Sequence, residues 1–174
     1  TGQVEAENGG DYQEAVLVEN HDNILFEKLE IQNERLVTRP GVEDKDAYGI
    51  YILNTMGGLV MENFEFRDLV FRKVYGAKPI LQDEGEAAFN GLEVAAIRFF
   101  SSFNAVAGQE KYIRNILVED CFFTDLQRLG VHIKHGGGND SVSEELSRNH
   151  DIIVRNNEFQ HTGGTCVLPI RTHN

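Results

Sequence analysis

Basic and aromatic side chains recur at matching places in four short apolar segments. The segments are GIYILN (49–54), AAIRFF (95–100), GVHIKH (130–135) and TCVLPIR (165–171). In a strand whose Val and Ile side chains point inward, the intervening side chains point outward. Read in register, the predicted outward residues are Tyr51 and Leu53, Arg98 and Phe100, His132 and Lys134, and Pro169 and Arg171.

This outward row could bind a sugar polymer. Aromatic faces pack on pyranose rings, and cations pair with carboxylate or sulfate groups. The row therefore predicts a polysaccharide or oligosaccharide substrate of anionic character. The predicted substrate-binding residues are Tyr51, Arg98, Phe100, His135, His161 and His173. A solvated outer face with scattered charges is the alternative interpretation.

Two carboxylates beside this row could catalyse hydrolysis. A polar column is predicted at Asn33, Asp68, Asp125 and His161. Glycosidases use two carboxyl groups, about 5 Å apart in retaining enzymes and about 6.5–9.5 Å apart in inverting ones. Asp68 and Asp125 are the candidate acid and base, and a polar ladder that closes a turn is the competing interpretation.

A second chemistry would use cations. A Lys, Arg or His side chain can remove the proton next to a uronate carboxylate while another cation stabilises the enolate. The catalytic candidates for this elimination are His132, Lys134 and Arg171. Neither chemistry demands a cofactor.

Metal binding has little support in the sequence. The acidic residues that could hold Ca2+ are Asp44, Asp46, Asp83, Glu84 and Glu86, and they lack EF-hand spacing. The two cysteines, Cys121 and Cys166, have no CxxC partner, so we predict free thiols and no structural metal.

The elements that must position these residues follow from an internal repeat. Four segments share one apolar pattern: NILFEKLEIQN (23–33), GLVMENFEFRD (58–68), NILVEDCFFTD (115–125) and DIIVRNNEFQH (151–161). A spacing of two indicates strands. The aligned columns are Ile24, Leu59, Ile116 and Ile152; then Phe26, Met61, Val118 and Val154; and, beyond a two-residue polar corner, Ile31, Phe66, Phe123 and Phe159.

The corners favour a coil of strands over other β-folds. Asn63, Asp120 and Asn156 fall at the corners, and Asn and Asp tolerate the left-handed backbone of a sharp bend. The gaps between segments lack the helical periodicity of an α/β fold, and Asn90-Gly91 is the one tight-hairpin dipeptide. We therefore predict an all-β chain, a right-handed parallel β-helix or solenoid in which each turn is stabilised by stacking on its neighbours.

The columns recur at uneven intervals of 35, 57 and 36 residues. We expect long loops at about 34–48, 76–94, 101–111 and 136–148, or an additional coil in the longest interval. Loops of this length could wall a groove. We expect one β-helix domain over 1–174, a fragment of a longer coil that is incomplete at one or both ends.

Charge and hydropathy exclude two classes of partner. Sixteen basic and 28 acidic residues leave a net charge of −12, which repels the phosphate backbone, so we expect no nucleic acid partner. The chain has no apolar run near twenty residues, so we expect no membrane span. The oligomeric state stays open.

The repeats NILVEDCFFTDLQRLGVHIKH and HDIIVRNNEFQHTGGTCVLPIR resemble those of the pectate-lyase-like superfamily of right-handed parallel β-helix proteins. Many members are polysaccharide lyases or glycoside hydrolases, and the lyases often carry Lys and Arg on adjacent coils, as Lys134 and Arg171 would. The resemblance implies a secreted, periplasmic or cell-surface carbohydrate-active enzyme that degrades polysaccharide.

Three functions remain open at this point. We place glycoside hydrolase slightly ahead of polysaccharide lyase acting by β-elimination. The third is a non-catalytic, glycan-binding or structural β-helix. The sequence does not distinguish them because repeats of this kind specify the coil better than the reaction.

Overall fold

The computed structural model describes residues 2–5, 14–34, 46–76, 93–102, 110–136, 148–170 and 172. Within these ranges the chain is all-β. The strands are β1 (Gly2–Glu5), β2 (Glu14–Glu19), β3 (Ile24–Glu27), β4 (Leu29–Glu34), β5 (Ala47–Asn54), β6 (Val60–Arg67), β7 (Val70–Tyr75), β8 (Val94–Ser101), β9 (Tyr112–Glu119), β10 (Phe122–Leu126), β11 (Leu129–His135), β12 (His150–Arg155), β13 (Glu158–Thr162) and β14 (Val167–Ile170). None of the described segments forms a helix with the length and apolar character needed to cross a membrane.

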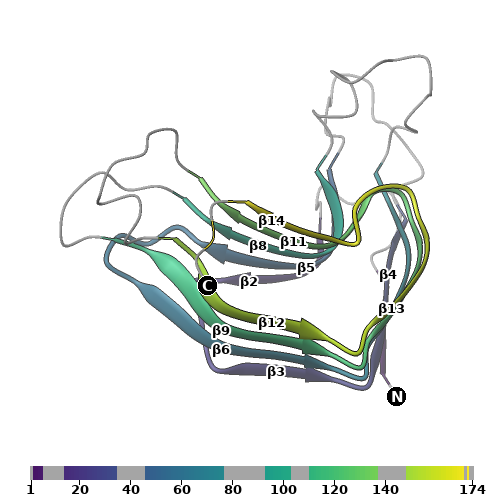
Figure 1. Cartoon of the computed structure of the whole chain (residues 1–174), viewed down its shortest axis with the longest axis horizontal. Coiled ribbons are helices and arrows are strands. Elements are labelled where there is room, and N and C mark those ends of the chain that lie inside the picture. The colour runs from purple at the N-terminus through teal and green to yellow at the C-terminus, as the bar shows by residue number, and fades with distance from the viewer. Residues whose placement is uncertain are drawn as a thin grey trace, which may run out of the picture.

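The strands form three parallel sheets that the chain visits in turn (Figure 1). Sheet A has the order β1-β4-β7-β10-β13, sheet B the order β14-β11-β8-β5-β2 and sheet C the order β12-β9-β6-β3. From β2 onward the chain passes from sheet B to sheet C to sheet A and returns to sheet B one level further on. This cyclic order, with every strand paired in parallel to strands of the neighbouring levels, is consistent with the predicted parallel β-helix.

The core lies between the three sheets and consists of side chains stacked from level to level. Phe71, Phe123 and Phe159 occupy one column in sheet A. Their ring centroids are 5.0 and 4.5 Å apart, and the planes are nearly parallel, at 4° and 7°. In sheet C, Phe26 stacks on Phe66 at 5.2 Å. These aromatic columns bury large apolar areas and fix the position of each level on the next.

The predicted alignment of the second repeat is wrong. Strand β3 pairs with the second half of β6, so Phe64 lies beside Ile24 and Phe66 beside Phe26. The predicted partners, Leu59 and Met61, lie elsewhere, Leu59 before the strand and Met61 beside Ile113. The sequence 58–68 mimics the repeat because Leu59 and Met61 also alternate with polar residues. The predicted corner at Glu62-Asn63 therefore falls inside a single strand, and the apolar strand β7 was missed.

The corrected alignment also removes the additional coil considered for the longest interval. Equivalent residues of sheet C, such as Asn23, Asn63 and Asn115, are separated by 40 and 52 residues along the chain and bond directly to one another. Strand β6 pairs with β9 without an intervening strand. The extra residues therefore belong to longer connections between levels.

Left-handed residues mark the bends of every level. The bend between sheets C and A has Lys28, Asp68, Asp120 and Asn156 at φ angles of 51° to 56°. A second series, Asn23, Asn63, Asn115 and Asp151, has φ angles of 53° to 63°; Asn23 directly precedes β3, and the other three lie inside β6, β9 and β12. Polar corner residues were predicted, and Asp120 and Asn156 confirm the prediction. Asn63 belongs to the second series, where its Nδ2 donates to Asn23 Oδ1 at 2.7 Å.

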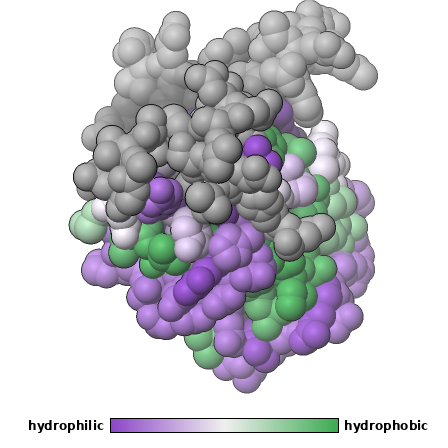
Figure 2. Space-filling model, turned by 60° about the vertical axis from the view of Figure 1, so that its left-hand side comes forward, coloured by the Kyte–Doolittle hydropathy of each residue, from purple (hydrophilic) through white to green (hydrophobic). Residues whose placement is uncertain are grey.

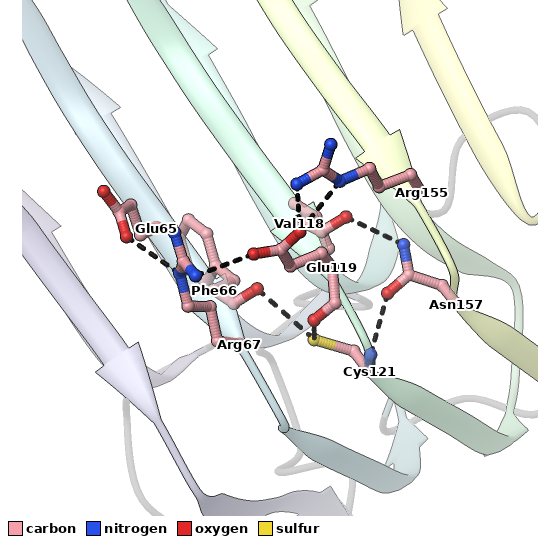
Figure 3. A network of polar contacts seen from close by, with 8 residues as sticks. All are labelled: Glu65, Phe66, Arg67, Val118, Glu119, Cys121, Arg155 and Asn157. Atoms are coloured by element: carbon pink, nitrogen blue, oxygen red, sulfur yellow. Dashed lines mark hydrogen bonds and ion pairs between the residues drawn. The ribbon is translucent and has the colours of Figure 1, made fainter.

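A charged ladder crosses the outer face of sheet C (Figure 3). Its column runs Glu27, Arg67, Glu119, Arg155. The Glu119 side chain is 8% exposed and accepts bonds from Arg67 Nη1 at 2.8 Å and from Arg155 Nη2 at 2.7 Å. Alternation of charge from level to level favours this register over a shifted one.

A cavity in the aromatic column should be costly. We expect Phe123→Ala to lower the free energy of unfolding by about 3–5 kcal/mol, because the fully buried ring packs between two others. The adjacent Phe122 is half-buried, and Phe122→Ala should cost about 1 kcal/mol. Urea unfolding monitored by circular dichroism measures both, and equal losses would contradict the inward assignment of Phe123.

The ladder yields a second stability prediction. Glu119→Gln keeps the side-chain size but removes the charge between two arginines, and we expect a loss of about 1–2 kcal/mol, limited by the solvent exposure of both partners. Glu65→Gln is the matched control, because Glu65 is 46% exposed and Arg67 is the one ladder residue with which it forms an ion pair in the described part of the chain. The control should lose less than about 0.5 kcal/mol in the same unfolding assay.

Candidate functional site

The outer face of sheet B carries the predicted row of side chains. Tyr51, Arg98 and His132 occupy one column across β5, β8 and β11. Phe100 and Lys134 are neighbours in the next outward column. Their predicted side-by-side placement is confirmed. The register of the last strand was predicted one residue too late, because Leu168 pairs with His132 and Ile170 with Lys134, whereas Pro169 pairs with the inward-facing Ile133.

Arg98 is the centre of a largely buried cluster. The residue is 3% exposed, and its guanidinium forms an ion pair with Glu93. Its Nη1 lies 3.1 Å from His132 Nδ1. The guanidinium also lies 5.1 Å from the ring centroid of Tyr48, 5.5 Å from that of Tyr51 and 5.3 Å from that of Phe100. Cation–π contacts therefore cover part of the aromatic surface that was expected to stack on sugar rings.

Two carboxylates flank the cluster on adjacent levels. Asp46 and Glu93 directly precede Ala47 and Val94, which pair with each other in sheet B. Asp46 Oδ1 accepts a hydrogen bond from the backbone N–H of Glu93 at 2.9 Å. The pairing places the two acidic residues at adjacent positions in neighbouring levels.

The remaining contacts of the two carboxylates differ. The Tyr48 hydroxyl donates to Asp46 Oδ2 at 3.3 Å, and burial raises the pKa of Tyr48, so the hydroxyl retains its proton. Lys134 Nζ donates to Glu93 Oε1 at 2.8 Å. Asp46 therefore has a neutral donor beside it, whereas Glu93 lies between two cations.

The pKa values of the two carboxyl groups move in opposite directions. Burial raises the pKa of Asp46 above its usual 3.8, and the nearby negative charge of Glu93 adds to this effect. Burial alone would raise the pKa of Glu93 too, but the charges of Arg98 and Lys134 outweigh it and hold the pKa below 4.5. A pair whose pKa values shift in opposite directions can divide the roles of acid and base.

His132 is held neutral. Burial, together with the charges of Arg98, Lys134 and Arg128 and against an opposing contribution from Glu93, lowers its pKa from 6.5 to about 4. The residue is 3% exposed.

The other predicted site residues that the structure describes lie apart from this cluster. His135 is fully buried in the inward column of Ser101 and Asn54, on the opposite side of β11 from Lys134. Asp125 lies in sheet A, where His161 Nδ1 approaches its Oδ1 to 3.4 Å. Arg171 and His173 lie outside the described residues.

The predicted polar column of Asp68 and Asp125 is wrong. Asp68 and Asp120 lie at equivalent positions in the bend between sheets C and A. Asp125 instead lies in register with Lys73 and His161 in sheet A. The separation of these two positions is five residues of strand, about 16 Å, which exceeds the spacing of a glycosidase pair. The error follows from the misaligned second repeat.

Glu93 and Tyr48 were missed as site residues. Both lie at strand starts, outside the apolar segments used for alignment, although Glu93 stands five residues before Arg98 as a charged residue next to a buried strand. Asp46 was considered for Ca2+ only. Across the described ranges, no group of three or more His, Cys, Asp or Glu side chains is arranged to hold a metal ion, and Asp44, Asp83, Glu84 and Glu86 lie outside them. Cys121 and Cys166 are free thiols, as predicted.

A hollow lies on the outer face of sheet C, away from the sheet B cluster. Its volume is about 650 Å3, and Asn63, Asn115, Asp151, Ile153 and Arg155 contribute to its lining. Figure 2 shows hydrophobic patches beside hydrophilic ones on the described surface. Leu25 and Ile153 are among the exposed apolar residues, at 56% and 52%. The hollow brings together none of the residues of the sheet B cluster.

No protein-family model, curated protein or solved structure matches the chain. A function must therefore be argued from the fold and from the side chains described above.

The neutral state of His132 predicts a pH-dependent stability. The pKa of His132 is lower in the folded state than in the unfolded state. Its contribution to the free energy of unfolding is therefore complete above pH 6.5 and is lost as the pH falls toward 4, by about 3 kcal/mol in total. His132→Gln should remove this loss of stability between pH 6.5 and 4. His161→Gln is the control, because its side chain is 78% exposed, and it should keep the loss. Unfolding free energies at pH 4 to 7.5 measure it, and parallel curves for wild type and His132→Gln would contradict the assignment.

Proposed function

We propose that this chain is a right-handed parallel β-helix of the pectate-lyase-like superfamily and a carbohydrate-active enzyme that cleaves glycosidic bonds. The cyclic order of the three parallel sheets and the short left-handed bends support the fold assignment. The resemblance of the repeats supports the superfamily and an extracellular, periplasmic or cell-surface location. The reaction is argued from the cluster on sheet B.

Hydrolysis is the reaction that this cluster supports best. The observation that carries it is the pair of neighbouring carboxyl groups with opposed pKa shifts, Asp46 raised and Glu93 lowered. Asp46 would protonate the leaving oxygen as the general acid. Glu93, kept ionised by Arg98 and Lys134, would act at the anomeric carbon as the nucleophile or activate the attacking water.

The backbone register favours the retaining variant. Paired strands lie about 4.8 Å apart, and Asp46 and Glu93 directly precede the paired residues Ala47 and Val94. Carboxyl groups that keep this backbone spacing would be near the separation of about 5 Å used for a covalent glycosyl intermediate, and below the separation that admits a water molecule between them.

The cations of the cluster support an anionic substrate. Arg98 and Lys134 lie on the outer face of sheet B. Arg128 interacts electrostatically with Glu93 and Asp46. These positive groups gather in a chain whose net charge is −12. Lys134 is 32% exposed and is the cation best placed to meet a carboxylate of the substrate.

Elimination by a lyase is the second candidate, favoured by the proximity of Arg98, His132 and Lys134. In that reaction Lys134 would remove the proton next to the uronate carboxylate and Arg98 would stabilise the enolate. Lys134 already forms an ion pair with Glu93, so its amine is engaged and not free to take a substrate proton, which favours hydrolysis over this alternative.

A polysaccharide panel tests the proposal. The full chain is incubated with polygalacturonate, alginate and a neutral β-glucan, and both reducing ends and the ultraviolet absorbance of an unsaturated product are followed. New reducing ends without this absorbance support hydrolysis, and the absorbance supports elimination. Binding without either signal leaves the non-catalytic, glycan-binding function.

Substitution of the two carboxyl groups identifies the acid. We expect Asp46→Asn to lower kcat by about 10²–10⁴ on a natural polymer and much less on an aryl glycoside, whose leaving group needs no proton. Glu93→Gln should lower kcat on both. Asp68→Asn and Asp125→Asn are the matched controls and should stay near wild type, and full activity of Asp46→Asn on the polymer would refute the assignment.

A further inference from the structure

We propose that His132 is a fixed hydrogen-bond donor of the sheet B site, whose Nε2–H binds an oxygen atom of the substrate, and that it is not a proton-abstracting base. This assignment rests on the proposed function only in that the oxygen belongs to a sugar. It reverses the role that the sequence suggested for this residue.

Arg98 sets the tautomer of the ring. A guanidinium group has N–H donors and no acceptor, so the contact of 3.1 Å between Arg98 Nη1 and His132 Nδ1 requires Nδ1 to accept. A neutral imidazole has one donor and one acceptor nitrogen. The proton therefore resides on Nε2.

Two features keep the ring in this state. Protonation would place a hydrogen on Nδ1, where it would face the Arg98 donor, and would add a positive charge beside Arg98, Lys134 and Arg128. The carboxylate of Glu93 opposes this effect on His132, and it is paired with Arg98 and Lys134. A base whose lone pair already accepts a bond from Arg98 has no free site for a substrate proton.

The Nε2–H group has no hydrogen-bond partner among the described residues, although the atom is buried. In an imidazole ring Nε2 lies at the end remote from the backbone, so on an outward side chain it faces away from sheet B. The neighbour of His132 on the following level is Leu168, which offers no side-chain acceptor. Buried polar groups are nearly always paired, so this donor is available for an acceptor brought by a ligand.

The chemistry of the donor defines what it can bind. A neutral N–H donates to a hydroxyl, ring or carboxylate oxygen. Because His132 is 3% exposed, such a hydrogen bond is stronger there than in water. Lys134, two residues further along β11 on the same face, would supply the charge for an acidic group beside it. His132 would thus orient the sugar while Asp46 and Glu93 carry the reaction.

The first experiment is a nitrogen NMR titration of the histidine-labelled full chain without ligand. We expect His132 to show a protonated Nε2 and an unprotonated Nδ1 from pH 5.5 to 8, with no titration step. A proton on Nδ1, or a step near pH 6.5, overturns the proposal whether or not the chain cleaves polysaccharide. Addition of oligogalacturonate or oligoalginate should then shift Nε2 more than Nδ1, and no shift with either ligand also overturns it.

The second experiment compares side chains that retain different atoms of the ring. Gln places an amide donor near the position of Nε2, whereas Asn reaches only the position of Nδ1. We expect His132→Gln to keep KM within about threefold of wild type and His132→Asn to raise it about tenfold, with kcat nearly unchanged in both. A fall in kcat of a hundredfold in His132→Gln would show a base instead. Failure of the Asp46 and Glu93 variants to lose activity would overturn the proposed hydrolysis without changing the NMR result.

Discussion

Parallel pairing between successive levels is the constraint on which the rest of this structure depends. Each strand bonds to the strand one level away, so a side chain in an inner strand of a sheet has a fixed neighbour above and below it. A shift of one residue would turn an inward column outward, because side chains alternate along a strand. The stacked rings of Phe71, Phe123 and Phe159 oppose such a shift from inside, and the alternating charges around Glu119 oppose it from outside.

The bends transmit this register from sheet to sheet. Left-handed residues recur at equivalent positions, so each level leaves one sheet and enters the next at the same angle. The bend that joins sheets C and A is short, and the connections between sheets A and B and between sheets B and C include the longer segments. The outer face of sheet B thus lies between the variable parts of the levels, where a site can be built without disturbing the stack.

The sheet B cluster illustrates what rigid columns do to ionisable groups. The paired strands hold Arg98 and Lys134 on neighbouring levels, and Asp46 and Glu93 directly precede the paired residues Ala47 and Val94. The pKa values of the two carboxyl groups diverge according to their neighbours: the cations lower that of Glu93, and burial raises that of Asp46. The same rigidity fixes the tautomer of His132 through Arg98. Preorganised polar groups of this kind suit catalysis, since they need no rearrangement during the reaction.

The sequence by itself determined the all-β class, the inward and outward alternation, and the row of Tyr51, Arg98 and His132, because these follow from local periodicity of two within single strands. Only the tertiary structure decided which levels align. Leu59 and Met61 satisfy the same local pattern as Phe64 and Phe66, and only packing against Phe26 and Ile24 distinguishes them. Asp46 and Glu93 precede their strands, 47 residues apart, and no local pattern relates them. The pairing of Ala47 with Val94 brings them together, and that pairing is a long-range interaction which the local sequence does not encode.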